Sequence, residues 1–252
     1  MRNPMHIPRE DIEALRREKY AGRLDANMHD DIARLMRGEP LAYVIGTQPF
    51  LGLEILLDSH PLIPRPETEW WTEELLKQLP QRYRTTISIL DMCAGSGAIG
   101  LALLKHLPQA HVTFSDIDAG HIADIQKNIV HNHLDATRAE LCTGNLFENL
   151  EQKRFDIIAT NPPYIPEART LQASVTEYEP PRALYGGTDG LTYITQILEQ
   201  APQFLKKDGV LYLECDSTHS FEVLARARTH GAKEAEIRND PYGRPRLLVA
   251  YY

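Results

Sequence analysis

Residues 90–100 read LDMCAGSGAIG and decide the fold class of this chain. The stretch follows an apolar run at residues 87–90 and leads into a helix-length segment, so it has the pattern of a strand, a glycine-rich turn and a helix. Gly95, Gly97 and Gly100 match the spacing G-x-G-x-x-G. Glycine has no Cβ, so the backbone of such a turn can approach a ligand closely. The stretch predicts a βα unit with a ligand at its turn.

The same alternation continues on both sides of this stretch. Apolar runs without polar alternation, typical of strands covered on both faces, lie at residues 87–90, 112–114, 155–159 and 210–213. Helix-length segments lie between them, at residues 97–107, 119–133 and 191–206. Strands that alternate with helices predict an α/β fold with a mostly parallel sheet.

The part of the chain before this pattern is different. Residues 1–40 predict a short helical region that ends at Gly38 and Pro40, and residues 41–64 predict a β-hairpin-like connector. The α/β domain would then occupy residues 65–252. Within it, residues 165–190 are rich in proline and glycine and lack periodicity, and a loop of that length is usually functional.

Composition narrows the class of protein. The net charge of −8 argues against a protein that wraps nucleic acid, because that affinity comes mainly from Lys and Arg. The three cysteines have no C-x-x-C spacing, which favours a reducing compartment. We find no signal peptide and no apolar run near the roughly 18 residues that span a bilayer, so we expect a cytoplasmic protein.

Two carboxylates suggest which ligand the turn binds. Asp116 ends the next predicted strand, where it can accept hydrogen bonds from the ribose hydroxyls of an adenosine-containing cofactor. Asp91 precedes the glycines, where it suits a sulfonium cofactor with an amino group but would repel a pyrophosphate. This favours S-adenosylmethionine over a nicotinamide dinucleotide. An ordinary strand–helix turn with a solvated aspartate is the alternative.

Asn161, Pro162, Pro163 and Tyr164 follow the predicted strand at residues 155–159. A stiff loop with two prolines offers carbonyl acceptors. The Asn161 side-chain oxygen and the Pro162 carbonyl could accept the two N–H donors of a substrate amide, and Tyr164 could form an aromatic wall beside it. Such a clamp would be best satisfied as charge builds on the nitrogen during methyl transfer. A merely rigid turn is the alternative.

The NPPY residues, with DMCAGSG upstream at residues 91–97, resemble methyltransferases that act on exocyclic or amide nitrogens. Three further segments resemble the HemK/PrmC family, the release factor N(5)-glutamine methyltransferases: RGEPLAYVI at 37–45, LIPRPETE at 62–69 and EPPRALYGGTDGL at 179–191. The resemblance runs from about residue 35 to the C-terminus. It implies a class I, Rossmann-like methyltransferase domain with a seven-stranded, mostly parallel sheet.

The resemblance also implies a site, whose substrate is the glutamine in the GGQ motif of class I peptide chain release factors. The cofactor S-adenosylmethionine, with S-adenosylhomocysteine as product, would be held by Asp91, Cys93, Ala94, Gly95, Ser96, Gly97, Asp116, Ile117, Asn145, Leu146 and Asn161. The glutamine would be held by Asn161, Pro162, Pro163 and Tyr164, with Arg65, Glu67 and Thr68 close to the cofactor. No metal is implied.

This chain departs from the family pattern in three places. Its N-terminal helical region is about half the usual length. Cys93 replaces the first glycine of the turn, where we expect a negative φ to make it harmless. Asn145 replaces the usual aspartate, so its bond to the adenine amino group should be weaker. In the long loop, we expect Glu177 and Glu179 to be solvated or paired with Arg182.

Other functions share some of these residues. A ribosomal protein glutamine methyltransferase has the same NPPY loop, and a DNA or RNA adenine or guanine methyltransferase would use it on an aromatic amine. The acidic balance and the lack of a Lys/Arg-rich segment disfavour nucleic acid. A non-catalytic cofactor-binding module and a nicotinamide oxidoreductase complete the alternatives.

Overall fold

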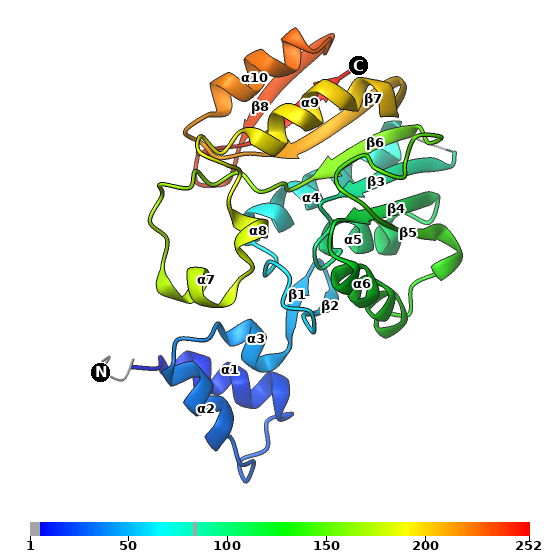
Figure 1. Cartoon of the computed structure of the whole chain (residues 1–252). Helices are drawn as coiled ribbons and strands as arrows, with labels where there is room; N and C mark the ends of the chain where they lie inside the picture. Colours follow the sequence, from blue (N-terminus) through cyan, green and yellow to red (C-terminus); the bar gives the residue numbers. More distant parts are fainter. Residues whose placement is uncertain (1–5, 83–84) are drawn as a thin grey trace.

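The computed structural model describes residues 6–82 and 85–252. A small helical region near the N-terminus is joined through a short hairpin to an α/β domain built on a central sheet (Figure 1). The strands are β1 Thr47–Phe50, β2 Leu53–Leu56, β3 Ile87–Met92, β4 Ala110–Asp116, β5 Ala139–Thr143, β6 Phe155–Thr160, β7 Leu205–Glu214, β8 Glu234–Asn239 and β9 Pro245–Tyr251. The α-helices are α1 Arg9–Lys19, α2 His29–Met36, α3 Leu41–Ile45, α4 Pro66–Arg82, α5 Ala98–His106, α6 Ala119–His131, α7 Ala173–Tyr178, α8 Pro181–Leu184, α9 Thr192–Phe204 and α10 Ser220–Thr229.

In the described part of the chain, one sheet has seven strands in the order β5-β4-β3-β6-β7-β9-β8. Strand β9 alone runs in the direction opposite to the other strands of this sheet, so the predicted mostly parallel sheet is confirmed. The four apolar runs in the sequence lie in β3, β4, β6 and β7. Strands β5 and β8 lie at the sheet edges, where partly exposed residues replace a continuous apolar run.

The strand order creates a switch point beside β3. The chain places β4 and then β5 on one side of β3, and returns to place β6 on its other side. Connections that leave neighbouring parallel strands in opposite directions open a crevice at their carboxyl ends, where α/β proteins bind ligands. The glycine-rich turn after β3 and the NPPY residues after β6 both begin at this edge.

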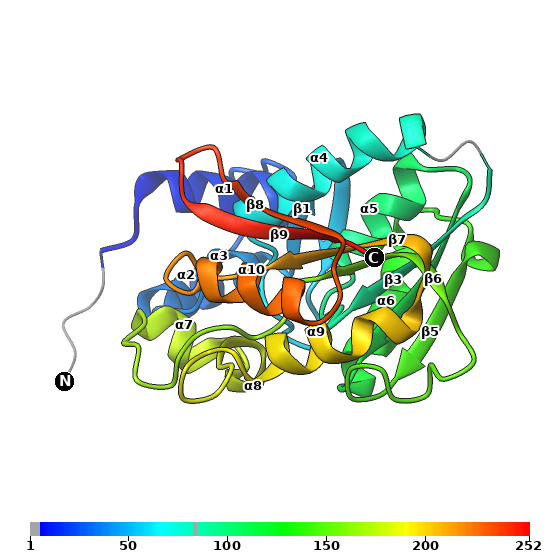
Figure 2. The ribbon, with the colours of Figure 1, turned by 90° about the horizontal axis from the view of Figure 1, so that it is seen from above.

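The two faces of the sheet bury two separate apolar clusters. Alternate residues of β3 point to opposite faces: Ile89 belongs to the cluster with α4, α5 and α6, and Leu90 to the cluster with α9 and α10. Trp71, in α4, is fully buried against the first face, whereas the adjacent Trp70 is only partly buried, as expected for neighbours on one helix. Figure 2 shows these helices on the two sides of the sheet.

The N-terminal helices form a small cluster of their own around Leu15, Leu35 and Val44. Residues 41–45, which we expected within the connector, form the short helix α3 in this cluster. The hairpin of β1 and β2 follows, and Asn128 of α6 accepts a hydrogen bond from Leu56 N–H at 2.7 Å. The hairpin is therefore tied to the α/β domain. The division of the chain at residues 40 and 64 stays a prediction.

The long segment at residues 165–190 is not a bare loop. It contains the two short helices α7 and α8, and Figure 1 shows it extending toward the N-terminal helices. Tyr178 in α7 donates a hydrogen bond to the Arg37 carbonyl at 3.0 Å. Among the described helices, none is long and apolar enough to cross a membrane.

Candidate active site

The glycine-rich turn leaves β3 through a left-handed backbone. Cys93 has φ 55°, Gly95 has φ 52° and Gly97 has φ 79°. The expected negative φ of Cys93 is therefore wrong, and a non-glycine residue in this conformation costs about 1–2 kcal/mol. Burial raises the pKa of the Cys93 thiol to about 12, so at neutral pH the side chain is an uncharged thiol.

Asp116 is held at the end of β4 by the turn itself. Its carboxylate accepts hydrogen bonds from Gly95 N–H at 2.8 Å and Asp118 N–H at 2.9 Å, and it contacts His121 Nδ1 at 3.2 Å. Burial acts to raise the pKa of Asp116, but the hydrogen bonds from His121 and these backbone groups outweigh it and the net shift is downward. Asp116 is therefore ionised at neutral pH and able to accept further donors.

Asp91 lies beneath the turn instead of beside the cavity. It is completely buried, and one carboxylate oxygen accepts a hydrogen bond from Gly100 N–H at 2.8 Å. Its other oxygen, Oδ1, is buried without a hydrogen-bond partner, and burial raises the pKa of Asp91 well above its ordinary value. The expected direct contact with a cofactor amino group does not follow from this geometry. Asp91 instead ties the start of α5 to β3.

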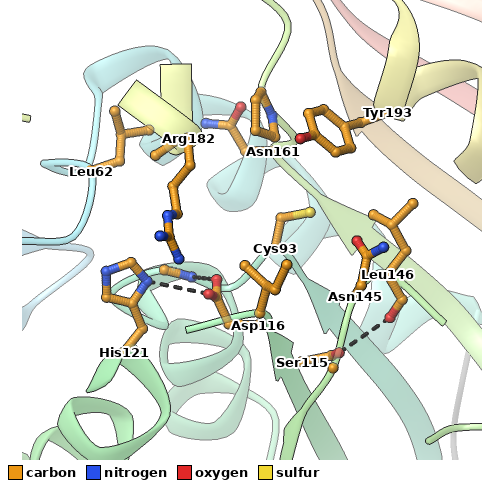
Figure 3. A pocket seen from close by; sticks show the side chains of 15 residues that line it. Leu62, Cys93, Ser115, Asp116, His121, Asn145, Leu146, Asn161, Arg182 and Tyr193 are labelled. Atoms are coloured by element: carbon orange, nitrogen blue, oxygen red, sulfur yellow. Dashed lines mark hydrogen bonds and ion pairs between the residues drawn. The ribbon is translucent and has the colours of Figure 1, made fainter. Parts of the chain in front are cut away.

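A cavity of about 810 Å³, including its open mouth, lies over the carboxyl ends of β3, β4 and β6. Figure 3 shows Asp116, Cys93, Leu146 and Asn161 around it. The predicted residues that line it are Cys93, Gly95, Asp116, Ile117, Asn145, Leu146, Asn161 and Pro163. A smaller adjoining pocket brings in Arg65, Thr68, Ala94 and Ser96. Among the residues predicted to bind the cofactor or to lie close to it, Asp91, Gly97 and Glu67 line neither of these two cavities.

Asn161 lies where this cavity meets another one. The second cavity, of about 680 Å³, is lined by Pro162, Tyr164 and Arg65 as well as Asn161. Asn161 Nδ2 donates a hydrogen bond to Thr68 Oγ1 at 3.1 Å. The amide therefore presents its nitrogen to the protein, and its oxygen Oδ1 is left to accept from a ligand.

Two glycines of the long segment support the backbone of the NPPY residues. A Cβ on Gly186 would lie 2.5 Å from the Pro163 carbonyl oxygen, and one on Gly190 would lie 2.3 Å from the Tyr164 carbonyl oxygen. The Ile165 N–H also donates to the Leu184 carbonyl at 3.0 Å. The segment at residues 165–190 thus packs directly against the predicted clamp.

Glu179 corrects another expectation from the sequence. It is only 3% exposed, and its carboxylate binds Arg65 at 2.6 Å and accepts a hydrogen bond from Ile63 N–H at 3.2 Å. It is neither solvated nor paired with Arg182, which instead lies 3.5 Å from Asp118. The pair joins the segment LIPRPETE to the long loop on one side of the second cavity.

Several residues that lie at the site were not predicted as site residues. Leu62, His121, Arg182 and Tyr193 line the first cavity, and Glu214 binds the Tyr164 hydroxyl at 2.9 Å. The sequence could have identified Glu214 as a site residue, because it follows the apolar run at residues 210–213 and so ends a strand at the ligand-binding edge. Leu62 and Arg182 lie in two of the segments that resemble the family, at residues 62–69 and 179–191, whereas His121 and Tyr193 give no comparable signal in the sequence.

Comparisons with known proteins agree with the fold. Residues 69–178 match the family model described as Methyltransferase small domain. Two relatives named release factor glutamine methyltransferase, from Geobacter sulfurreducens and Agrobacterium fabrum, are 39% and 38% identical over 86% of this chain and cover 75% and 76% of their own lengths. A methyltransferase structure from Pyrococcus furiosus matches with a TM-score of 0.60 at 19% identity, covering 88% of this chain and 97% of that one.

Proposed function

The chain belongs to the release factor glutamine methyltransferase family, and from this membership we propose that it transfers a methyl group from S-adenosylmethionine to the side-chain amide nitrogen of the glutamine in the GGQ motif of class I release factors. The observation that carries the proposal is the position of Asn161. This residue lines both the cavity with Asp116 and the cavity with Tyr164, so it can contact a cofactor and a substrate together.

The first cavity fits the proposed cofactor. Asp116 supplies an ionised acceptor for two ribose hydroxyls, and Ile117 and Leu146 supply apolar walls for the adenine. Asn145 supplies a neutral acceptor for the adenine amino group. The bound cofactor supplies an electrophilic methyl group on a sulfonium.

The residues of the chain would accelerate the reaction by orienting the glutamine amide. Asn161 Oδ1 and the Pro162 carbonyl would accept hydrogen bonds from the two N–H groups of the glutamine amide, and the Tyr164 ring would form a wall of the same cavity. With its protons held, the amide nitrogen can turn its lone pair toward the methyl group. These acceptors are best satisfied as positive charge develops on nitrogen, so they stabilise the transition state more than the ground state.

The proposed reaction also identifies the protein partner. We propose that the substrate is a folded release factor whose exposed GGQ loop enters the second cavity, and that the reaction takes place in the cytoplasm, where translation termination occurs. The long segment contacts the N-terminal helices through Tyr178, and these helices would form part of the partner surface.

The proposal is tested with methyl-labelled S-adenosylmethionine and an unmodified class I release factor. A release factor with Ala in place of the GGQ glutamine serves as the matched control. We expect label only in the glutamine protein, and Asn161→Ala should lower the rate by about 100-fold. No incorporation despite calorimetric binding of S-adenosylhomocysteine would reject the release factor as substrate. Parallel reactions with ribosomal proteins and with short DNA or RNA would then identify the substrate class.

A further inference from the structure

Glu214 lies at the centre of a buried hydrogen-bond network beneath the clamp, although it lines neither of the two large cavities. We propose that Glu214 is a positioning residue with two branches: one carboxylate oxygen sets the orientation of the Asn161 amide through Thr68, and the other holds Tyr164 directly. This inference rests on the proposed function, because it assigns Asn161 and Tyr164 to the glutamine.

The two oxygens of the Glu214 carboxylate accept hydrogen bonds from different donors. Glu214 ends β7 and is 1% exposed. Its Oε2 accepts from Thr68 Oγ1 at 2.6 Å and from Trp71 Nε1 at 2.7 Å. Its Oε1 accepts from the Tyr164 hydroxyl at 2.9 Å. Three donors from α4 and the NPPY turn therefore meet one buried acceptor group.

The proton count explains how the first branch works. The Trp71 indole can only donate, and the Thr68 hydroxyl has a single proton, which it gives to Glu214. Thr68 Oγ1 then has only lone pairs to offer to Asn161. Asn161 must present its NH₂ group there, as observed at 3.1 Å, and its oxygen is left for the substrate. The carboxylate thereby decides which end of the Asn161 amide faces the reaction.

An acceptor-only group is needed at position 214 for both branches to hold together. Burial raises the pKa of Glu214, while the hydrogen bonds from Thr68, Trp71 and Tyr164 favour its ionised form. A glutamine would keep one acceptor oxygen, and the donor-only Trp71 would draw that oxygen to the Oε2 position. Thr68 would stay oriented, but an NH₂ group would face the Tyr164 hydroxyl. The two branches can therefore be separated by mutation.

The experiment first measures wild-type methylation of the release factor. Thr68→Val keeps the shape but removes the hydroxyl, and we expect kcat to fall on the order of 10- to 100-fold with KM for the release factor unchanged. Thr68→Ser should restore kcat to within about 3-fold of wild type. Thr72→Val is the matched control: Thr72 is buried on the same helix, and its hydroxyl donates only to the Thr68 carbonyl.

The second branch is tested by a double-mutant cycle. Tyr164→Phe removes this contact, and Glu214→Gln weakens it by replacing the charged acceptor with an NH₂ group that can only donate to the hydroxyl. Both should lower kcat, and the double variant should be no slower than the slower single variant, because both act on the same contact. Glu214→Gln combined with Thr68→Val should instead multiply the two losses. Equal activity of Thr68→Val and wild type, or multiplicative losses in the Glu214–Tyr164 cycle, would overturn the inference.

A readout without catalysis separates this inference from the proposed function. In ¹⁵N-asparagine-labelled protein, the side-chain NH₂ signal of Asn161 is identified by its loss in Asn161→Ala. We expect this signal to shift in Thr68→Val and to stay in place in Thr68→Ser and Thr72→Val. An inactive wild type would sink the proposed function while this shift still supported the network. An active wild type with an unmoved signal in Thr68→Val would sink the network alone.

Discussion

A Cβ atom on Gly190 would lie 2.3 Å from the carbonyl oxygen of Tyr164, closer than real side chains come to a backbone atom. Gly190 also has φ 79°, a conformation that favours glycine. The end of the long loop is thus packed against the backbone of the proposed substrate clamp. This contact explains why a segment distant from the NPPY residues in sequence is part of the same site.

Gly190→Ala is expected to impair both stability and catalysis. Its left-handed backbone alone costs about 1 kcal/mol, and the clash with Tyr164 must in addition displace the clamp. Gly231→Ala is the matched control, because Gly231 has φ 91° but no atom within 4 Å of an added Cβ. Urea denaturation and kcat measure the two effects. If both variants kept wild-type kcat, the Gly190 contact would have no role in positioning the clamp.

Substitutions of Cys93 would measure the backbone strain in the glycine-rich turn. Cys93→Gly removes a left-handed cost of about 1–2 kcal/mol, but it adds about 0.5–1 kcal/mol of unfolded-chain entropy and loses the partly buried thiol. We expect these terms nearly to cancel, with a change in unfolding free energy below about 1 kcal/mol. Cys93→Val places a β-branched side chain at positive φ and should destabilise by about 2 kcal/mol. Equal stability of the Gly and Val variants would contradict this account of the turn.

Asp116 should dominate cofactor affinity. Asp116→Ala removes the proposed acceptor for the ribose hydroxyls and the partner of Gly95 N–H, so we expect the Kd for S-adenosylhomocysteine to rise by about 10- to 100-fold. Asp116→Asn keeps one acceptor oxygen and should have a smaller effect. Isothermal calorimetry measures both. Unchanged binding in Asp116→Ala would place the ribose elsewhere.

Asp216 binds Arg169 of the long loop, and we expect this contact to weaken at acid pH. Its carboxylate accepts hydrogen bonds from Arg169 and Thr218. Burial acts to raise the pKa of Asp216, but the Arg169 guanidinium and the Thr218 donors outweigh it and lower the pKa well below its ordinary value of 3.8. Because the folded pKa is depressed, the stabilisation is present above that ordinary value and is lost as the pH falls through and below it.

Asp216→Asn should therefore lower the unfolding free energy by about 2 kcal/mol at pH 7. The gap from wild type should narrow below about pH 4, where the wild-type carboxyl begins to lose its advantage. Denaturation curves at pH 7, 5 and 3 measure it. A difference that stayed constant down to pH 3 would mean that the ionised Asp216 does not stabilise the fold.

The sequence by itself determined the local parts of this protein. The glycine turn, Asp116 and the NPPY residues are consecutive or lie at strand ends, so backbone preferences and the order of strands and helices are enough to place them at one edge of the sheet. The apolar runs likewise identify the buried strands, because a strand covered on both faces leaves a continuous signature.

Only the tertiary structure decided how distant side chains meet. Thr68 and Glu214 are 146 positions apart, and Arg65 and Glu179 are 114 apart, so their pairing depends on how α4 and the long segment pack against the sheet. The positive φ of Cys93 and the burial of Asp91 beneath the turn also come from packing, which can override local preference at a ligand-binding site. Spacing along the chain predicts which residues share an edge, whereas the direction of each side chain depends on the neighbours that surround it.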